Sequence, residues 1–121
     1  MVAAMTSRLR EPSYYILAVL QDEPLHGYAI ITHTAELSQG RVKLATGTLY
    51  AALDRLAAEG LIESVREEIV NGRARRYYAL TPSGMVALKA EAQALAQAAS
   101  VVTDRAARHA TVIARPAARL A

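Results

Sequence analysis

The sequence predicts a mainly α-helical fold that carries one small β-hairpin. Apolar residues recur at helical spacing in four segments, and the last of these is much longer than the others. Between the third and fourth segments the pattern changes, and Asn71-Gly72 gives the strongest short-range signal for a two-residue hairpin turn. The 121 residues suit a single domain, and 53% of them are hydrophobic, which is enough to form a core.

The composition limits the compartment and the kind of partner. Cysteine is absent, which excludes disulfides and thiolate chemistry and agrees with a reducing compartment. No apolar run approaches the roughly 20 residues that span a bilayer, and the first residues lack the apolar core of a signal peptide. We therefore expect a cytoplasmic protein with no membrane partner. The net charge of +3 does not by itself distinguish a nucleic-acid-binding patch from an ordinary solvated surface.

The chain is expected to open with a flexible arm over residues 1–11, followed by a short buried helix. Arg8 and Arg10 give the arm the charge to touch a phosphate backbone or a minor groove, and simple disorder is the alternative interpretation. Pro12 suits the first turn of the helix. Apolar residues cover most sides of this helix, which predicts burial: Ile16, Leu17, Val19 and Leu20.

A second helix is expected within residues 25–40, ending at Gly40. Its spacing predicts that Tyr28, Ile31, Ala35 and Leu37 face inward, with Ile30 nearby. His26 and His33 lie seven residues apart with no cysteine in the chain and few acids in register. We therefore interpret both histidines as structural or solvent-facing, and we expect no metal site.

The third helix follows over residues 46–60 and has two distinct faces. Thr46 is the predicted N-terminal cap and Gly60 the terminator. Leucines recur at intervals of four and three on the face predicted to be buried. The opposite face is small and polar, so it suits close approach to another surface. The buried set is Leu49, Leu53 and Leu56, and the opposite set is Thr48, Tyr50, Ala51, Asp54 and Arg55.

The hairpin that follows has a register fixed by its turn. A two-residue turn at Asn71-Gly72 places Val70 opposite Arg73. The same register pairs Glu68 with Arg75, Glu67 with Arg76 and Val65 with Tyr78. Both charged pairs have opposite signs and contribute about 0.2–1 kcal/mol each, which supports the register. Arg73 is left at the tip and is expected to project outward.

A long helix is predicted over residues 82–115, with Thr81 as its cap, Pro82 as its first residue and 116–121 as a tail. At 1.5 Å per residue it is roughly 50 Å long, too long for so small a domain to cover. We therefore expect a homodimer in which the long helices of two copies pack together. Part of the apolar face of this helix could instead pack against the partner's N-terminal domain. A heptad spacing runs along one seam: Met85, Leu88, Ala92, Leu95, Ala99, Val102, Ala106, His109 and Ile113.

The order of the elements is that of a winged helix-turn-helix domain over residues 12–81, followed by a dimerisation helix. In this arrangement the third helix enters the DNA major groove and the hairpin, the wing, contacts the flanking backbone. A helical bundle with an unrelated hairpin is the alternative. On residues alone, Lys43 and Arg73 are the expected charge contacts, and Arg55 would reach a base edge unless Asp54 holds it.

Three stretches together resemble the PadR family of transcriptional regulators. They are "LHGYAI" at 25–30, "GTLYAALDRLAAEGLI" at 47–62 and "RRYYALTPSG" at 75–84, in the family's order. The single long C-terminal helix is similar to the shorter-tailed subfamily. Two departures exist: position 51 is Ala where the family often has proline, and the chain lacks the tryptophan that some drug-binding relatives use.

The resemblance implies a homodimeric repressor that binds a palindromic operator and is released by a small aromatic or drug-like molecule. It places Thr46, Gly47, Thr48 and Tyr50 at the DNA surface, with Arg73 and Arg75 on the wing. A space beside Tyr14 or Tyr15 and the long helix, near Leu95 and Ala99, would suit a flat effector. The alternative is that these tyrosines only pack a dimer interface.

Other functional classes fit less well. No serine–histidine–acid set, paired carboxylates, glycine-rich phosphate loop or metal spacing is present, so we expect neither an enzyme nor a cofactor. A winged-helix regulator of another family, such as a MarR-like one, would generally place helices on both sides of the winged domain. A winged-helix protein-interaction module would not need the arginine-tipped hairpin.

Overall fold

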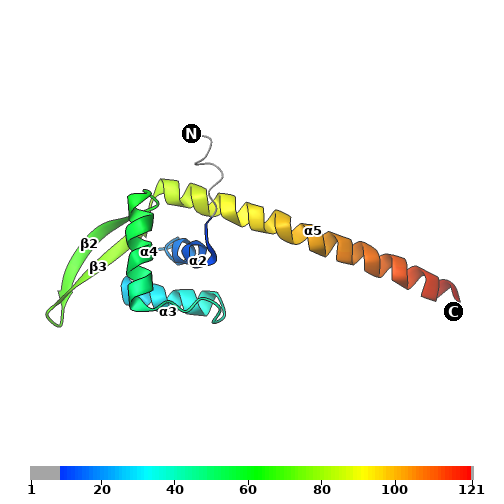
Figure 1. Cartoon of the computed structure of the whole chain (residues 1–121), viewed down its shortest axis with the longest axis horizontal. Coiled ribbons are helices and arrows are strands. Elements are labelled where there is room, and N and C mark those ends of the chain that lie inside the picture. Colours follow the sequence, from blue (N-terminus) through cyan, green and yellow to red (C-terminus); the bar gives the residue numbers. More distant parts are fainter. Residues whose placement is uncertain (1–8, 121) are drawn as a thin grey trace. The chain divides into compact units, whose positions relative to one another are not determined.

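The computed structural model describes residues 9–120, with side chains described as far as residue 110. The chain divides into two units, Met1–Glu91 and Ala92–Ala121. The expected order of helices, hairpin and long helix is confirmed (Figure 1). One short strand, β1, is added to the expected elements. The elements are α2 (Glu11–Val19), β1 (Leu25–His26), α3 (Gly27–Leu37), α4 (Thr46–Ala58), β2 (Ile62–Val70), β3 (Arg73–Leu80) and α5 (Pro82–Leu120).

The core of the first unit lies among α2, α3 and α4. Each helix contributes side chains that are almost completely removed from water, and full burial of one such side chain stabilises the fold by roughly 1.5–3 kcal/mol. The predicted leucine face of α4 is confirmed in full. The fully buried apolar side chains of the three helices are Ile16, Leu17, Ile30, Leu49, Leu53 and Leu56.

The predicted inward face of α3 is wrong at two positions. Tyr28 is 75% exposed and Leu37 is 54% exposed. The buried stripe instead contains Gly27, Ile30 and Thr34. Two of these three residues are a glycine and a threonine. A prediction based on the spacing of large apolar residues takes no account of them. The prediction therefore included two large apolar residues, Tyr28 and Leu37, that lie on the exposed side of the helix.

The start of α2 also differs from the prediction. The helix begins at Glu11, within the expected flexible arm of residues 1–11, and Leu9 packs against the core. The physical reason is that Leu9 is apolar and close enough to the helix to be buried with it. The remainder of the predicted arm, residues 1–8 with Arg8, lies outside the described residues.

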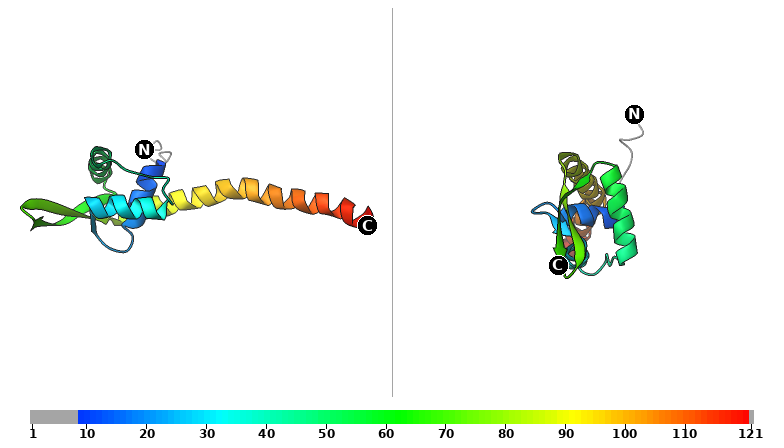
Figure 2. Two further views of the ribbon diagram at one scale, coloured as in Figure 1. Left: turned by 90° about the horizontal axis from the view of Figure 1, so that it is seen from below. Right: turned by 90° about the vertical axis from the view of Figure 1, so that its left-hand side faces the viewer.

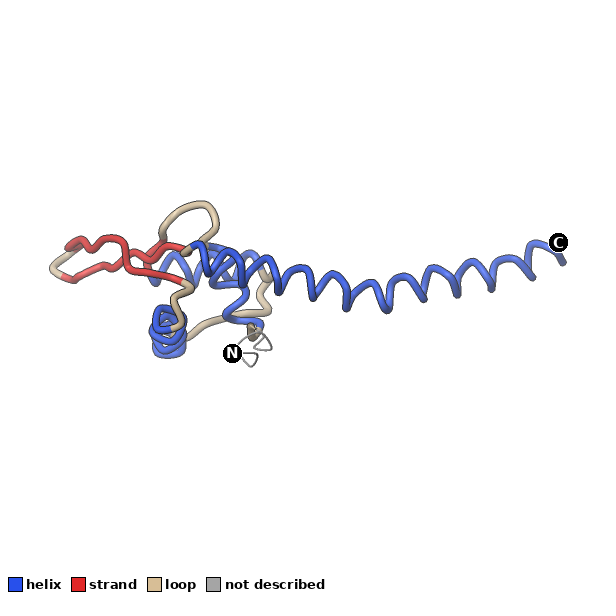
Figure 3. Tube along the Cα trace, turned by 90° about the horizontal axis from the view of Figure 1, so that it is seen from above, coloured by secondary structure: helices blue, strands red, loops and turns tan. Residues whose placement is uncertain are grey.

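The three strands form one antiparallel sheet in the order β1-β3-β2. β1 pairs Leu25 with Tyr78 and His26 with Tyr77, so it ties the start of α3 to the base of the hairpin. Figure 3 shows the hairpin strands joined by a short loop at their far end. Asn71 and Gly72 form that turn with positive φ angles of 53° and 76°. Positive φ at both residues confirms the predicted two-residue turn.

The predicted register holds along most of the hairpin and fails near its base. Val70 faces Arg73, Glu68 faces Arg75 and Glu67 faces Arg76, as predicted. A bulge between Ser64 and Arg66 then shifts the pairing, so Ser64 rather than Val65 faces Tyr78. The extra residue at a bulge bends and twists the strand. Here the bend lies where Ile62 and Tyr78 enter the core.

The start of α5 is fixed by its predicted cap. The Gly84 N–H donates to Thr81 Oγ1 at 3.0 Å, and the Thr81 hydroxyl donates to the Gly60 carbonyl at 2.6 Å. Gly84 itself leaves no room for a side chain, because a Cβ there would collide with the Leu61 carbonyl. These contacts fix the end of α4 to the start of α5.

The predicted end of α5 at Pro116 is wrong, because the helix continues to Leu120. Proline removes one backbone donor but does not prevent helix formation by the good helix formers that follow it. The predicted dimer seam also changes at its start. Leu88 is buried in the core of the first unit, so it is used within the domain.

The second unit consists of the remaining part of α5 and exposes apolar side chains. Leu95 is 42% exposed and Val102 is 67% exposed, and the seam positions Ala99, Ala106 and His109 are exposed as well. The side chain of Ile113 lies outside the described set. Across residues 9–120, no helix combines the length and apolar character that crossing a membrane requires.

Candidate nucleic-acid interface

The first turn of α4 is open to solvent. Ala45, not Thr46, is the N-cap, and no side chain caps the helix. The prediction was wrong because Ala45 already has the extended backbone of a cap and Thr46 is the first helical residue. Thr46, Gly47 and Thr48 therefore stand exposed in the first turn. A Cβ at Gly47 would meet no atom within 4 Å, so nothing in the domain covers this point.

Tyr50 follows on the same helix, and its side chain is partly packed against the domain and partly exposed to solvent. It is 44% exposed. A Cβ built at Gly27 would lie 2.5 Å from the Tyr50 hydroxyl oxygen, so the tyrosine sits against the glycine at the start of α3. The missing side chain of Gly27 thus sets where the Tyr50 ring can lie.

The cations close to α4 differ in how they are engaged. One terminal nitrogen of Arg55 donates to Ser13 Oγ at 2.9 Å, so α2 rather than Asp54 holds this side chain. Arg41 forms an ion pair with Glu11 at 2.5 Å. Lys43 is exposed, and within the described residues it has no ion pair. Lys43 is thus the available cation of the segment that precedes α4.

The wing, by which we mean β2, β3 and the Asn71-Gly72 turn, contains both paired and unpaired arginines. Arg76 lies 3.5 Å from Glu67, and its hydrogen bond with Tyr78, followed by the charge of Glu67, raises its pKa above the usual range. Arg73 is exposed and forms no ion pair with any described residue. Arg73 is therefore the arginine most available to an external anion.

The base of the wing is held by a small cluster on β1 and β3. The Arg66 guanidinium lies 3.9 Å from the centre of the Tyr77 ring, and the Tyr77 hydroxyl donates to Glu68 at 2.9 Å. The His26 ring meets Tyr77 edge-on at 5.3 Å between centres. A cation over an aromatic face and an edge-on ring pair are both attractive arrangements. They orient the hairpin relative to the start of α3.

His26 also caps α3. The Ala29 N–H donates to His26 Nδ1 at 3.4 Å, which requires a neutral imidazole at that nitrogen. Partial burial lowers the pKa of His26 below its ordinary value, the nearby charge of Arg75 lowers it further, and Glu68 opposes the shift. At neutral pH the ring is therefore uncharged and able to act as the cap.

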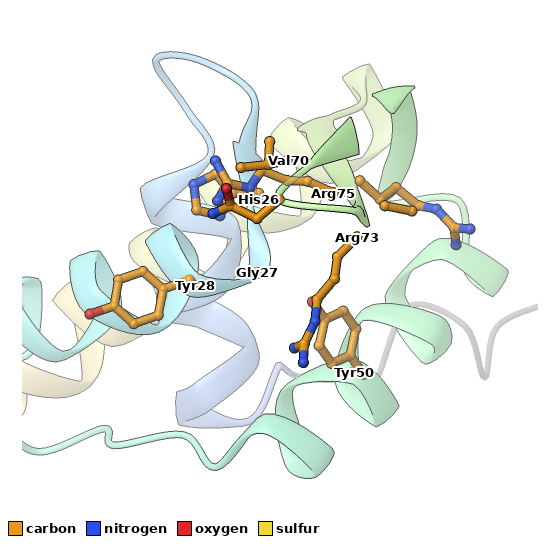
Figure 4. A pocket seen from close by; sticks show the side chains of 10 residues that line it. His26, Gly27, Tyr28, Tyr50, Val70, Arg73 and Arg75 are labelled. Atoms are coloured by element: carbon orange, nitrogen blue, oxygen red, sulfur yellow. The ribbon is translucent and has the colours of Figure 1, made fainter. Parts of the chain in front are cut away.

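These elements enclose an open cleft of about 420 Å³ between α3, α4 and the wing (Figure 4). Tyr50 and Arg73 face each other across it, and Tyr28 stands at its edge on α3. Figure 1 shows the base of the hairpin beside α4 and its tip leading away from the helix, which agrees with the contacts between α4 and β2, and Figure 2 gives two further views. None of the residues that line the cleft is acidic. The lining residues are His26, Gly27, Tyr28, Tyr50, Val70, Asn71, Arg73, Ala74, Arg75 and Arg76.

The cleft unites some of the predicted site residues and adds others. It brings together Tyr50, Arg73 and Arg75. The prediction missed His26, Gly27 and Tyr28, although they belong to the stretch "LHGYAI" that carries part of the family resemblance. Arg76 was interpreted only as a partner of Glu67, and that pairing is confirmed. The missed residues come from the start of α3, which only the three-dimensional fold brings beside the wing.

The predicted effector residues fall in both units. Tyr14 and Tyr15 meet edge-on with ring centres 5.5 Å apart and are partly buried against the core of the first unit. Leu95 and Ala99 belong to the second unit. The effector pocket therefore stays a prediction.

Comparison with known proteins gives a consistent classification. The family model described as "Transcriptional regulator PadR-like family" matches residues 16–90. The chain is 41% identical over 88 residues to "Transcriptional regulator Rv3488" of Mycobacterium tuberculosis, a match that covers 73% of this chain and 78% of that protein.

Solved structures agree with this match. A PadR family transcription regulator from Clostridium difficile is 28% identical with a TM-score of 0.63, over 78% of this chain and 97% of the other. PadR of Bacillus subtilis, solved in complex with operator DNA, is 30% identical with a TM-score of 0.59. That match covers 66% of this chain and only 46% of the B. subtilis chain.

Proposed function

Because the chain belongs to the PadR-like family of transcriptional regulators, we propose that it binds double-stranded DNA through α4 and the wing. The observation that carries this proposal is the cleft between these elements, which contains three arginines and no acidic residue. Clustered positive charge beside exposed donors is the footprint of a surface for nucleic acid. The solved complex of B. subtilis PadR with operator DNA supports DNA binding as the function.

In the proposed complex, α4 enters the major groove by its first turn. The hydroxyls of Thr46 and Thr48 and the N–H groups of this turn, which no side chain caps, would donate to phosphate oxygens. Gly47 would allow the backbone to approach closely, because no neighbour fills the space around it. These contacts would place α4 in the groove and let it approach the DNA closely, but they would add no positive charge.

Positive charge would come from outside the helix. Arg73 on the wing and Lys43 before α4 would contact the flanking backbone, with Arg75 beside them. Each phosphate contact adds about one unit to the salt dependence of binding. Arg55 would need to leave Ser13 before it could reach a base edge. We therefore assign the main charge contacts to Arg73 and Lys43.

The first experiment selects DNA from a random pool with the wild-type protein and then titrates variants in gel-shift assays. Tyr50→Ala and Arg73→Ala should each weaken binding by about tenfold, in line with contacts of roughly 1–3 kcal/mol. Lys89→Ala, an exposed lysine on α5, is the matched control and should bind as the wild type does. Normal binding by both test variants would show that the proposed surface is wrong.

We further propose that the protein acts as a homodimer on a palindromic operator. The second unit exposes Leu95 and Val102 on the predicted heptad seam, and burial of such apolar surface drives association. A twofold protein matches a palindromic site. Sedimentation at micromolar concentration should show a dimer, and Val102→Glu should shift it toward monomer. A wild-type monomer in that experiment would rule out the dimer.

The finer regulatory role is also a proposal. We propose repression relieved by a small aromatic or drug-like molecule near Tyr14 and Tyr15, whose rings form a partly buried edge-on pair. A screen of aromatic acids and cationic drugs for release of the selected DNA tests this. Released DNA with wild-type protein, but not with Tyr15→Ala, supports the site. Release that is unchanged in Tyr14→Ala and Tyr15→Ala would place the effector elsewhere.

A further inference from the structure

We propose that the cleft between the start of α3, Tyr50 and the wing seats a backbone phosphate of the bound DNA, and that Tyr28 is a contacting side chain of this seat. The inference rests on the proposed DNA-binding function, and it adds a third element, α3, to the recognition helix and the wing. The sequence pattern assigned Tyr28 to the core, and the family motif assigns it no contact with DNA.

Tyr28 has no role in the core that would account for it. It is 75% exposed, more than any other large hydrophobic side chain in the described part of the chain. It is the second residue of α3, and it lines the cleft together with Tyr50 and Arg73. Figure 4 shows its ring projecting from α3 at the edge of the cleft, with the hydroxyl on the side away from Tyr50 and Arg73. A tyrosine in this position offers a hydroxyl donor to a ligand that enters from solvent.

The charges around the cleft favour an anion. Arg73, Arg75 and Arg76 all line it, and no acidic residue does. Glu67 compensates Arg76 from outside the lining, but Arg73 has no ion-pair partner among residues 9–110. Arg73 and Arg75 therefore leave a local excess of positive charge, which an anion in the cleft would offset. The Arg73 guanidinium would meet a phosphate oxygen in the cleft, and the Tyr28 hydroxyl would meet the same strand where it passes the edge of the cleft on α3.

The geometry favours a DNA backbone over a small free anion. Tyr50 of α4 and Arg73 of the wing face each other across the cleft, so it lies between the two elements proposed to hold DNA. A duplex with α4 in its major groove would run its backbone between the helix and the wing. The cleft is also open to solvent rather than enclosed, which suits a long polymer.

Gly27 and His26 would position the parts of this phosphate seat relative to one another. Neither would bring a positive charge to the DNA. Because Gly27 has no side chain, the Tyr50 hydroxyl can lie against the start of α3. His26 accepts the Ala29 N–H and packs on Tyr77, so it joins the first turn of α3 to the wing. The parts of the seat thus come from three elements that are fixed to one another.

A charge scan at the two ends of α3 tests the proposal. Tyr28→Lys, Tyr28→Glu and Tyr28→Phe are compared with Leu37→Lys and Leu37→Glu, since both positions are exposed and substitution should not disturb the fold. Binding of the duplex selected by the wild-type protein is measured by fluorescence anisotropy across a salt series. Circular dichroism verifies that each variant is folded.

If Tyr28 lies at a phosphate, Tyr28→Lys should steepen the salt dependence by about one unit. Tyr28→Glu should weaken binding by tenfold or more, and Tyr28→Phe by about threefold to tenfold. The Leu37 variants should stay within about twofold of wild type. A single uncharged methylphosphonate placed at the contacted phosphate should weaken the wild type and have less effect on Tyr28→Phe.

The outcomes separate this inference from the proposed function. If Arg73→Ala weakens binding while the Tyr28 variants behave like the Leu37 variants, the phosphate seat is wrong and DNA binding stands. If the wild-type protein selects no DNA, both the seat and the proposed function fail. If Tyr28→Lys and Leu37→Lys steepen the salt dependence equally, the effect is one of general charge and overturns the seat.

Discussion

Helix α4 and the wing lie side by side at the candidate interface, but their positions depend on different interactions. α4 is held by Leu49, Leu53 and Leu56, which are at most 1% exposed. Most of the wing is exposed, and it depends on its turn, its cross-strand pairs and the contacts of Tyr77 at its base. The helix has few charged side chains, and its backbone is fixed by buried leucines. The wing has several charged side chains, but few of its residues are buried.

This difference indicates that α4 and the wing have different roles in binding. A contact element that is anchored in the core can present small polar groups and its own backbone with precision, because burial fixes it. A contact element outside the core can supply long charged side chains, whose reach tolerates small movements. Damage to α4 should therefore affect the whole fold, while damage to the wing should affect binding more than stability.

The largest effect is expected from Leu53→Asp, which attacks the buried side of α4. It replaces a fully buried leucine with an unpaired carboxylate, at a cost of more than about 4 kcal/mol. Since small domains have about 5–15 kcal/mol of stability, thermal melting by circular dichroism should show an unfolded or barely folded chain. Asp54→Ala, at the exposed next position, should melt close to the wild type. A folded Leu53→Asp variant would show that α4 is not anchored as described.

A smaller effect is expected from Gly72→Val, which attacks the turn of the wing. The φ of 76° at Gly72 is unfavourable for a β-branched residue and costs about 1–3 kcal/mol. The melting temperature should fall by roughly 5–15 °C, with the domain still folded at 25 °C, while DNA affinity falls by tenfold or more, because Arg73 follows the turn directly. Equal losses of stability and affinity in Leu53→Asp and Gly72→Val would remove the contrast between the two elements.

Gly47→Ala should change stability and binding in opposite directions. The position is helical and surrounded by open space, so alanine should stabilise the free protein by about 0.5–1 kcal/mol. The added methyl group would stand where DNA must approach, so affinity for the selected duplex should fall. Chemical denaturation and gel-shift titration measure the two changes. Unchanged affinity would mean that α4 does not approach DNA by this turn.

The smallest effect concerns pH and His26 at the base of the wing. Its pKa is lowered in the folded state, so as pH falls below about 6.5 the unfolded chain takes up the proton first. Stability contributed by the neutral ring is therefore present above that pH and lost below it. His26→Asn keeps an N-cap acceptor and removes the titration. Melting temperatures at pH 7.5 and 5.5 should differ less in this variant, and an equal difference would contradict this role of His26.

The parts of the fold that could be predicted from sequence are those set by local chemistry. Asn71-Gly72 specifies its own turn through positive φ angles, and opposite charges then agree with the register at Glu67 and Arg76. Thr81 and Pro82 likewise specify the start of a helix. The leucine spacing of α4 predicted its buried face because three of the four buried residues there are leucines, and the fourth is Ala52.

The features that were missed depend on contacts between distant segments. The exposure of Tyr28 follows from which side of α3 meets the core, and Gly27 and Thr34 carry no apolar signal of that choice. The bulge beside Ser64 depends on how β2 enters the core near Tyr78. The cleft combines residues near positions 27, 50 and 73, and spacing within one segment contains no information about that meeting.

The central claim is that the first turn of α4 and the tip of the wing both face the same DNA. Because the chain contains no cysteine, one can be introduced at a single point and labelled with an iron chelate that cleaves nearby DNA. Thr48→Cys should direct cleavage within each half-site of the selected duplex, and Arg73→Cys should direct it to the flanking backbone. Leu37→Cys, at the other end of α3, should direct none. Cleavage from position 37, or none from positions 48 and 73 while binding remains intact, would contradict the account.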